Sequence, residues 1–214
     1  MVKDLEVNNL LIVESQNDKY FIEALIQHLN INLKIGDTIC TIHEYECLNG
    51  IGELEKRFIK LKAKVEKENI KKIGIIFDAD DVGIDTRTQQ IQEKIDMVFN
   101  DVSDIDFSIY IMNVDDRGEL ETVLKQLKSK DSTIADCLDS WQECLPVDKK
   151  LNQKEFDKFW IQMYQRYDNC TKEEVKQAGK KCNNKVSFSK NIYDLNSPIL
   201  DNLKTFLQEL GEQK

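Results

Sequence analysis

The first half of the chain alternates between apolar runs of strand type and longer segments whose apolar residues recur with helical spacing. The segments of helical spacing cover residues 18–29, 52–68 and 86–100, and the apolar runs are NLLIVE (9–14), DTICTIHEYE (37–46), KKIGIIFD (71–78) and DFSIYIMNV (106–114). Strands that are apolar along most of their length are buried on both faces, and amphipathic helices between them supply the cover. We therefore expect an α/β fold, with a Rossmann-like parallel sheet flanked by helices.

Beyond about Gly118 the pattern becomes almost entirely helical. Ser132 and Thr171 are suitable N-cap residues, Pro146 marks a break, and residues 197–214 end the chain with one more amphipathic segment. No Pro- or Gly-rich linker separates this half from the first. We expect an α/β domain over residues 1–125 and a mostly helical C-terminal region, residues 126–214, packed on it as an appendage.

Charge and composition limit the partners of the chain. A net charge of −9 argues against a general, salt-driven grip on phosphate backbones, which needs Lys and Arg to displace counterions. No apolar stretch approaches the roughly 20 residues of a membrane helix, and the N-terminus carries carboxylates where a signal peptide has basic residues. We expect a cytoplasmic protein without a membrane segment.

Acidic residues gather where the apolar runs end. Glu14 ends the first run, Asp78 ends the third and Asp80 follows two residues later, while Glu119 and Glu121 come soon after the fourth. Because the carboxyl ends of parallel strands meet at one edge of the sheet, these side chains should lie close together. Their repulsion costs stability unless a cation neutralises it, and oxygen ligands of this type suit Mg²⁺ or Mn²⁺.

Several of these carboxylates also have a purely structural interpretation. Asp18 stands in an S-x-x-D capping box that starts at Ser15. Asp81 and Asp85 fit a turn and a helix start, and Glu119 and Glu121 fit the first turn of a helix, where the dipole favours negative charge. A carboxylate in the position of Glu14, directly after LLIV, has no capping role.

Other acidic motifs fit the letters less well. An EF-hand loop beginning at Asp78 would place Gln89 at its twelfth position, where a bidentate Glu is required, so this interpretation fails. Phosphatases of the haloacid-dehalogenase type carry Asp-x-Asp after their first strand. Here two strand-helix units precede the pair, so this class is a distant alternative.

The cysteines and histidines do not indicate a metal site. The six cysteines show no C-x-x-C spacing, and the two histidines, His28 and His43, lie far apart in the sequence. We expect reduced thiols, with both histidines in packing or surface roles.

Taken together, "LLIVESQND", "IGIIFDAD" and "GELE" resemble the motifs of a Toprim domain, the metal-binding module of topoisomerases, primases and overcoming-lysogenisation-defect (OLD) nucleases. In that family an apolar strand ends in Glu, usually Glu-Gly, with an acidic residue four places on, and a later strand ends in Asp-x-Asp. Glu14, Asp18, Asp78 and Asp80 match, whereas Ser15 stands where glycine is usual. The resemblance covers roughly residues 8–125, and the later segments look like small stand-alone Toprim proteins related to OLD nucleases.

This resemblance implies a Toprim-like fold and a Mg²⁺- or Mn²⁺-dependent phosphodiester hydrolase, nuclease-like, that acts on DNA or RNA. Its metal ligands would be Glu14, Asp18, Asp78, Asp80 and Glu121. A downstream lysine often accompanies such a site, and Lys185 is the candidate, with Lys181 second. The catalytic set would then be Glu14, Asp78, Asp80 and Lys185.

The alternative is a non-catalytic Toprim module that binds metal or nucleotide within a larger complex. The acidic net charge and Ser15 favour it. A protein partner or a homodimer is compatible with either function, because apolar residues of the helical half, such as those of "FDKFWIQMY", could form an interface.

Overall fold

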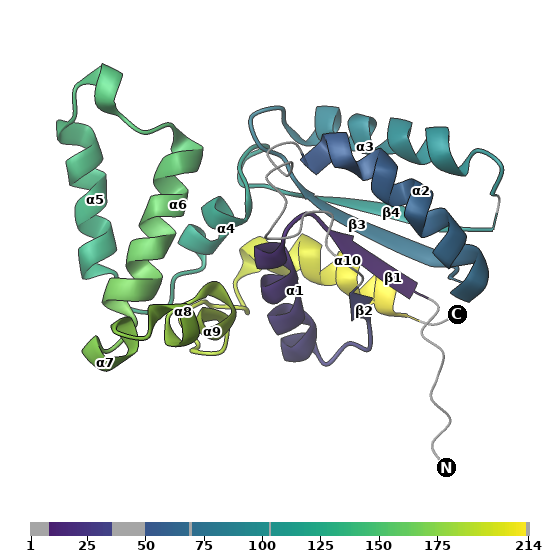
Figure 1. The fold of residues 1–214 in the computed structure, drawn as a ribbon. Helices are drawn as coiled ribbons and strands as arrows, with labels where there is room; N and C mark the ends of the chain where they lie inside the picture. Colours follow the sequence, from purple (N-terminus) through teal and green to yellow (C-terminus); the bar gives the residue numbers. More distant parts are fainter. Residues whose placement is uncertain (1–8, 36–49, 69, 103, 213–214) are drawn as a thin grey trace, which may run out of the picture.

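A parallel sheet forms the centre of the first half of the chain. The computed structural model describes residues 9–35, 50–68, 70–102 and 104–212. Its strands are β1 (Asn9–Val13), β2 (Lys34–Ile35), β3 (Lys72–Asp78) and β4 (Asp106–Met112), in the order β2-β1-β3-β4 and all parallel (Figure 1). This α/β architecture confirms the parallel sheet expected from the sequence. The strand predicted over residues 37–46 lies outside the described residues.

Helices cover both faces of this sheet, as Figure 1 shows. On one face, α2 (Gly50–Glu68) and α3 (Ile84–Phe99) pack on Leu10, Ile12 and Ile75. On the other, α1 (Gln16–Leu29) and α10 (Asp201–Gly211) pack on Leu11, Val13 and Ile76. Successive strand residues point to opposite faces, so a continuously apolar strand fills both cores.

The helical half begins where β4 ends. Figure 1 shows α5 and α6 side by side at one end of the molecule, with the short helices α7 to α9 below α6. The elements are α4 (Leu120–Gln126), α5 (Thr133–Cys144), η2 (Val147–Lys149), α6 (Gln153–Met163), η3 (Tyr164–Asp168), α7 (Lys172–Val175), α8 (Ala178–Lys181), α9 (Asn184–Phe188) and η4 (Pro198–Leu200). Thr171 caps α7 with its side chain, and Ser132 is the N-cap residue of α5.

The C-terminal helix returns to the sheet. Helix α10 packs on β3, β4 and α1, and the Asn9 side chain donates a hydrogen bond to the carbonyl of Leu210. Gly74 of β3 lies directly beneath α10, where a Cβ atom would collide with Leu210. One hydrophobic core therefore joins residues of the sheet with residues of the helical half. The proposed boundary near residue 125 stays a prediction.

The expectation of reduced thiols was wrong for one pair. Cys170 and Cys182, twelve residues apart, form a disulfide across α7 and α8, with Cα atoms 6.3 Å apart. The two cysteines meet because α7 and α8 pack against each other, and no local spacing motif predicts this pairing. Cys137 and Cys144 are free and exposed, and Cys40 and Cys47 lie outside the described residues.

Within the described ranges, no helix combines the length and the apolar character that a membrane-spanning segment needs.

Candidate acidic site at the carboxyl edge of the sheet

The segment that follows β3 is tied to the segment that follows β4. The Asp80 amide donates to the Gly118 carbonyl at 2.9 Å, and the Gly118 amide donates to the Asp80 carbonyl at 3.0 Å. Both residues have positive φ angles, 49° and 97°, which glycine adopts freely and which Asp tolerates better than most residues. This pairing brings the DAD and GELE motifs side by side.

Two further hydrogen bonds join three chain segments at this edge. The Leu120 amide, at the start of α4, donates to Asp78 Oδ1 at 3.2 Å, and the Asp78 amide lies 3.5 Å from Glu14 Oε2. Glu14 follows β1 directly, and Asp78 ends β3. The structure thus brings together the carboxylates that the sequence placed after neighbouring strands.

Asp18 has the structural role that its sequence context suggested. Its Oδ2 accepts a hydrogen bond from the Ser15 amide at 2.7 Å, and its amide donates to Ser15 Oγ at 3.3 Å, so that the pair forms a complete capping box. Asp18 is nevertheless buried, and its charge acts on Glu14 and Asp78. It caps α1 and also belongs to the acidic group.

Glu119 and Glu121 lie at the start of α4. Glu119 is only 3% exposed. Its Oε2 pairs with Lys158 at 3.0 Å and Lys154 at 3.2 Å, whereas its Oε1 is buried without a hydrogen-bond partner among the described residues. A buried carboxylate oxygen in this condition carries a desolvation cost that a ligand could relieve. Glu119, not only Glu121, is therefore part of the candidate site.

Burial dominates the electrostatics of the cluster. It raises the pKa of Glu14 to about 7, with the charges of Asp18 and Asp80 adding to the effect. It likewise raises the pKa of Glu121 to about 7, and neighbouring Glu119 contributes. The pKa of Asp78 lies well above its usual range because of burial and then the Asp18 and Glu14 charges, and burial also raises the pKa of Asp18. Negative charge is therefore only partly compensated here.

The site also contains three basic side chains that the sequence analysis did not select. Arg87, in the first turn of α3, donates to Asp80 Oδ2 at 2.6 Å and to the Asp78 carbonyl at 3.0 Å. Lys154 of α6 lies 2.6 Å from Asp80 Oδ1, and Lys158 lies one turn further along α6. Arg87 is nine residues from Asp78, so proximity in sequence could have suggested it. No local signal marks the two lysines, which come from the other half of the chain.

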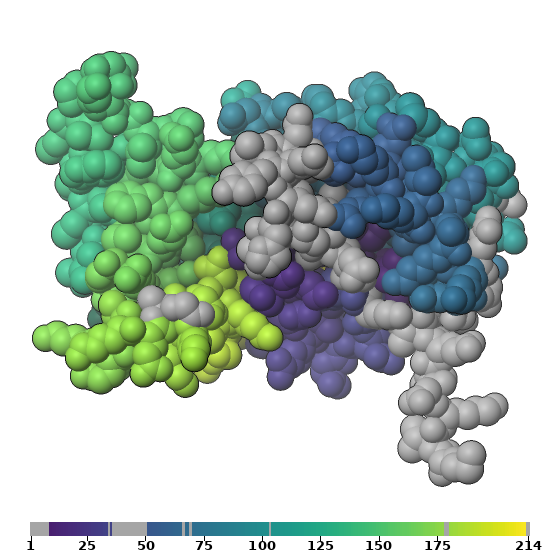
Figure 2. Space-filling model, viewed as in Figure 1, coloured from purple at the N-terminus to yellow at the C-terminus, as the bar shows by residue number. Residues whose placement is uncertain are grey.

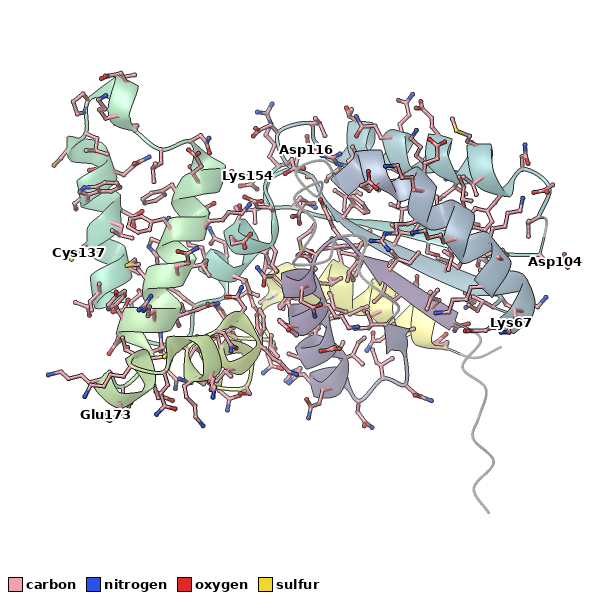
Figure 3. The ribbon with its side chains drawn as sticks, in the orientation of Figure 1. Lys67, Asp104, Asp116, Cys137, Lys154 and Glu173 are labelled. Carbon is pink, nitrogen blue, oxygen red and sulfur yellow. A yellow bond between two sulfur atoms is a disulfide. The ribbon has the colours of Figure 1, made fainter. Side chains whose placement is uncertain are left out.

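A cavity of about 260 Å³ opens beside these residues. Asp80, Glu119 and Lys154 line it together with Arg117 and Gln153. Figure 3 shows Lys154 at the end of α6 nearest the sheet, across from the loop that carries Asp116. Two members of the acidic cluster, Asp80 and Glu119, therefore face a space between the two halves of the chain.

The donor set fits a hard divalent cation in its chemistry. Carboxylate oxygens are the ligands that Mg²⁺ and Mn²⁺ prefer, and Glu119 Oε1 has no other partner in the described part of the chain. As the side chains stand, however, no three Asp, Glu, His or Cys residues of the described ranges converge as metal ligands. Metal binding would require carboxylates to rotate and Asp80 to exchange its Arg87 and Lys154 partners for the ion.

Lys185, the predicted catalytic lysine, lies on α9, where its Nζ sits 5.7 Å from the centre of the Tyr20 ring. It lines a different cavity, together with His28 and Phe188. Lys181 is exposed at the end of α8. His28 contacts Asn196 through Nε2 at 2.9 Å, and His43 lies outside the described residues.

Comparison with solved structures found the C-terminal region of the Burkholderia pseudomallei OLD protein, which shares 8% sequence identity. The alignment covers 96% of this chain and 99% of that one, with a TM-score of 0.43, which is too low to establish a shared fold. No curated protein shows significant similarity to the chain. The model of one protein family matches residues 8–212, nearly the whole sequence, and the chain accordingly belongs to the family described as "Protein of unknown function (DUF3226)".

Proposed function

We propose that the protein is a Mg²⁺- or Mn²⁺-dependent phosphodiester hydrolase that acts on nucleic acid at the acidic edge of its sheet. The observation that carries the proposal is that Glu14 and Glu119, from two further chain segments, lie near enough to Asp78 for their charges to raise its pKa, while one buried oxygen of Glu119 has no described partner. Several carboxylates that are buried or half-buried at one point repel each other, and a bound cation would offset that repulsion where the groups are ionised. The likeness of the motifs to those of Toprim domains supports the same function.

The chain supplies carboxylates that could bind metal ions and, next to them, lysines that could bind phosphate. Glu14, Asp78, Asp80 and Glu119 would hold one or two ions, and Asp18 and Glu121 would complete a second position or orient a ligand water. A bound Mg²⁺ or Mn²⁺ would activate the attacking water and neutralise charge on the leaving oxygen.

The lysines on α6 have a role that follows from their positions. Lys154 and Lys158 now pair with Asp80 and Glu119. If these carboxylates served as metal ligands, both ammonium groups would be released and could pair with a phosphate oxygen at the mouth of the cavity. In this proposal they take the phosphate-binding role, and Lys185 would stabilise the phosphate only if the substrate extends toward α9.

The test is incubation of the purified protein with plasmid, single-stranded DNA and structured RNA in Mg²⁺, Mn²⁺ or chelator. We expect metal-dependent cleavage that Glu14→Gln, Asp78→Asn and Asp80→Asn each abolish. Asp85→Asn is the matched control, because Asp85 is exposed in the first turn of α3 and should leave cleavage unchanged.

Asp78→Asn also separates a catalytic role from a structural one. Asparagine retains an oxygen that can accept the hydrogen bond from the Leu120 amide, and it removes a repelling charge, so Tm should stay equal or rise. A large fall in Tm would instead make Asp78 a structural residue.

A second candidate is a non-catalytic module that binds metal or nucleotide within a larger complex. It is favoured by the existing pairing of Asp80 with both Arg87 and Lys154, which satisfies this carboxylate without metal. Such a protein would show a Mg²⁺-dependent rise in Tm and no cleavage of any polymer. Turnover of a chromogenic phosphomonoester would point instead to a dehalogenase-type phosphatase.

A further inference from the structure

A second surface lies on the outer side of α1. Tyr20, Glu23 and His28 of that helix line a cavity of about 450 Å³ with Lys185 and Phe188 of α9. Tyr20 and Gln27 are seven residues apart and share one helix face, whereas His28, near the end of the helix, lies closer to the face that carries the buried Phe21 and Leu25. In Figure 2 the segment containing α7 to α9 abuts α1.

The segment that borders this cavity is basic, although the chain is acidic. Residues 172–190 contain six lysines and two glutamates, against a net charge of −9 for the whole protein. Of the six, Lys190 is engaged with Glu174 at 2.9 Å, and the other five are exposed: Lys172, Lys176, Lys180, Lys181 and Lys185. The disulfide between Cys170 and Cys182 holds most of the segment in a compact turn. A local positive surface of this kind suits a polyanion.

Aromatic side chains are interleaved with this charge. Lys185 Nζ lies over the Tyr20 ring at 5.7 Å, and Phe188 lines the same cavity. Phe188 is anchored against Phe21 of the core, with ring centroids 5.7 Å apart, so its position is fixed by packing. A ring with a lysine beside it is the combination that stacks a nucleobase while pairing its phosphate.

We propose that the surface formed by Tyr20 of α1, Lys185 and Phe188 of α9, and the exposed Lys180 and Lys181 of the preceding helix α8 binds single-stranded nucleic acid. The exposed lysines would contact phosphates, and Tyr20 would stack on a base. A single strand is favoured over a duplex because base faces are accessible only when they are unpaired. The choice of nucleic acid as the polyanion rests on the proposed function.

The surface also has a geometric relation to the acidic site. Asp18 belongs to the acidic cluster, and His28, ten residues later on α1, lines the second cavity. Ten residues of α-helix span about 15 Å. This distance is short enough for one single strand bound beside α1 to extend toward the acidic site.

The experiment measures binding separately from cleavage. Fluorescently labelled oligo(dT) and oligo(U), each about 20 nucleotides long, are titrated with protein in chelator at low salt, and anisotropy gives Kd. The test variant is Lys180→Glu/Lys181→Glu. The matched control is Lys60→Glu/Lys67→Glu, which makes the same change in net charge on α2, and Figure 3 shows Lys67 far from α7 to α9.

We expect the test variant to weaken binding by about tenfold or more and to flatten the salt dependence of Kd, with the control within about twofold of the unmodified protein. Tyr20→Ala should weaken binding by about fivefold or more, while Tyr20→Phe, which keeps the ring, should not. Equal losses in both lysine pairs, tighter binding of a duplex, or no binding of any oligonucleotide would overturn the proposal.

The outcome is distinguishable from failure of the proposed hydrolase activity. Binding in chelator that depends on Lys180, Lys181 and Tyr20 supports the surface even if no metal produces cleavage. If the Lys180→Glu/Lys181→Glu and Tyr20→Ala variants still cleave nucleic acid and bind it with unaltered Kd, the proposed hydrolase activity stands and the proposed binding surface is wrong.

Discussion

At the scale of single residues, the acidic cluster is a set of carboxylates that burial pushes toward the protonated form. Glu14 and Glu121 both have a pKa of about 7, and the pKa values of Asp18 and Asp78 are raised as well. The charge state of this site therefore changes near neutral pH, where ordinary carboxylates are fully ionised. Either a bound cation or a proton can neutralise the negative charge of these carboxylates.

The first prediction concerns pH. Between about pH 4.5 and 7 the folded protein retains protons on Glu14 and Glu121 that the unfolded chain has already released, so the free energy of unfolding should fall as pH rises through this window. The expected loss is on the order of 1 kcal/mol per group, because the groups interact and are partly solvated. Thermal unfolding in chelator at about pH 5.5 and 7.5 measures it.

Two comparisons make this prediction specific. Glu14→Gln/Glu121→Gln should flatten the pH dependence, and Mg²⁺ should raise Tm more at the higher pH, where the carboxylates are ionised. An unchanged slope in the double variant would contradict the assignment of the titration to these residues.

At the scale of elements, α1 is placed by its first turn. Ser15 stands between Glu14 and the helix, and the reciprocal bonds between Ser15 and Asp18 fix where the helix begins. Because Glu14 precedes this cap directly, the cap also sets the direction in which Glu14 leaves β1. Ser15, which stands where the Toprim motif usually has glycine, thus serves as the N-cap of α1.

The second prediction tests this cap. Ser15→Ala should lower the free energy of unfolding by about 1 kcal/mol, since it leaves the Asp18 amide without its partner, whereas Ser15→Gly should cost only a few tenths, about 0.3 kcal/mol. Urea denaturation measures both. Ser140→Ala, at an exposed position of α5, is the control and should change stability by less than about 0.5 kcal/mol. Equal stabilities of the Ala and unmodified proteins would show that the cap contributes nothing.

The sequence predicted the local features of this fold and missed the contacts between distant segments. The three long strands were recognisable because their apolar runs are continuous, and the capping box because its two residues are three apart. Lys154 meets Asp80 across 74 residues, and the Cys170–Cys182 disulfide depends on a turn between two short helices. Such contacts depend on how elements pack, which periodicity does not encode. For this reason Glu14 and Asp78 could be selected from the sequence, whereas Lys154 and Lys158 could not.

At the scale of the whole molecule, α10 connects the end of the chain to its beginning. It lies against β3, β4 and α1, with Leu203, Leu207 and Leu210 buried. Gly74 allows this close approach because it has no side chain. The sheet therefore depends on a helix contributed from the far end of the sequence.

The third prediction places the same substitution at two glycines. Gly74→Ala should destabilise the protein by about 1–3 kcal/mol, because the new methyl group displaces Leu210 from a packed interface. Gly52→Ala, at an exposed position in the first turn of α2, should stabilise it by up to about 0.5 kcal/mol through helix propensity. Denaturant midpoints with unchanged m-values measure both changes. A neutral Gly74→Ala variant would contradict the packing of α10 on β3.

The position of α10 has a consequence for how the protein is made. A ribosome releases β1, β3 and β4 well before it synthesises residues 201–211. Until then α1 alone covers that face of the sheet, and the aliphatic side chains that α10 will cover lack their packing partner. The nascent chain thus exposes apolar surface throughout synthesis of the helical half, and this is the interval in which it should be most prone to aggregation.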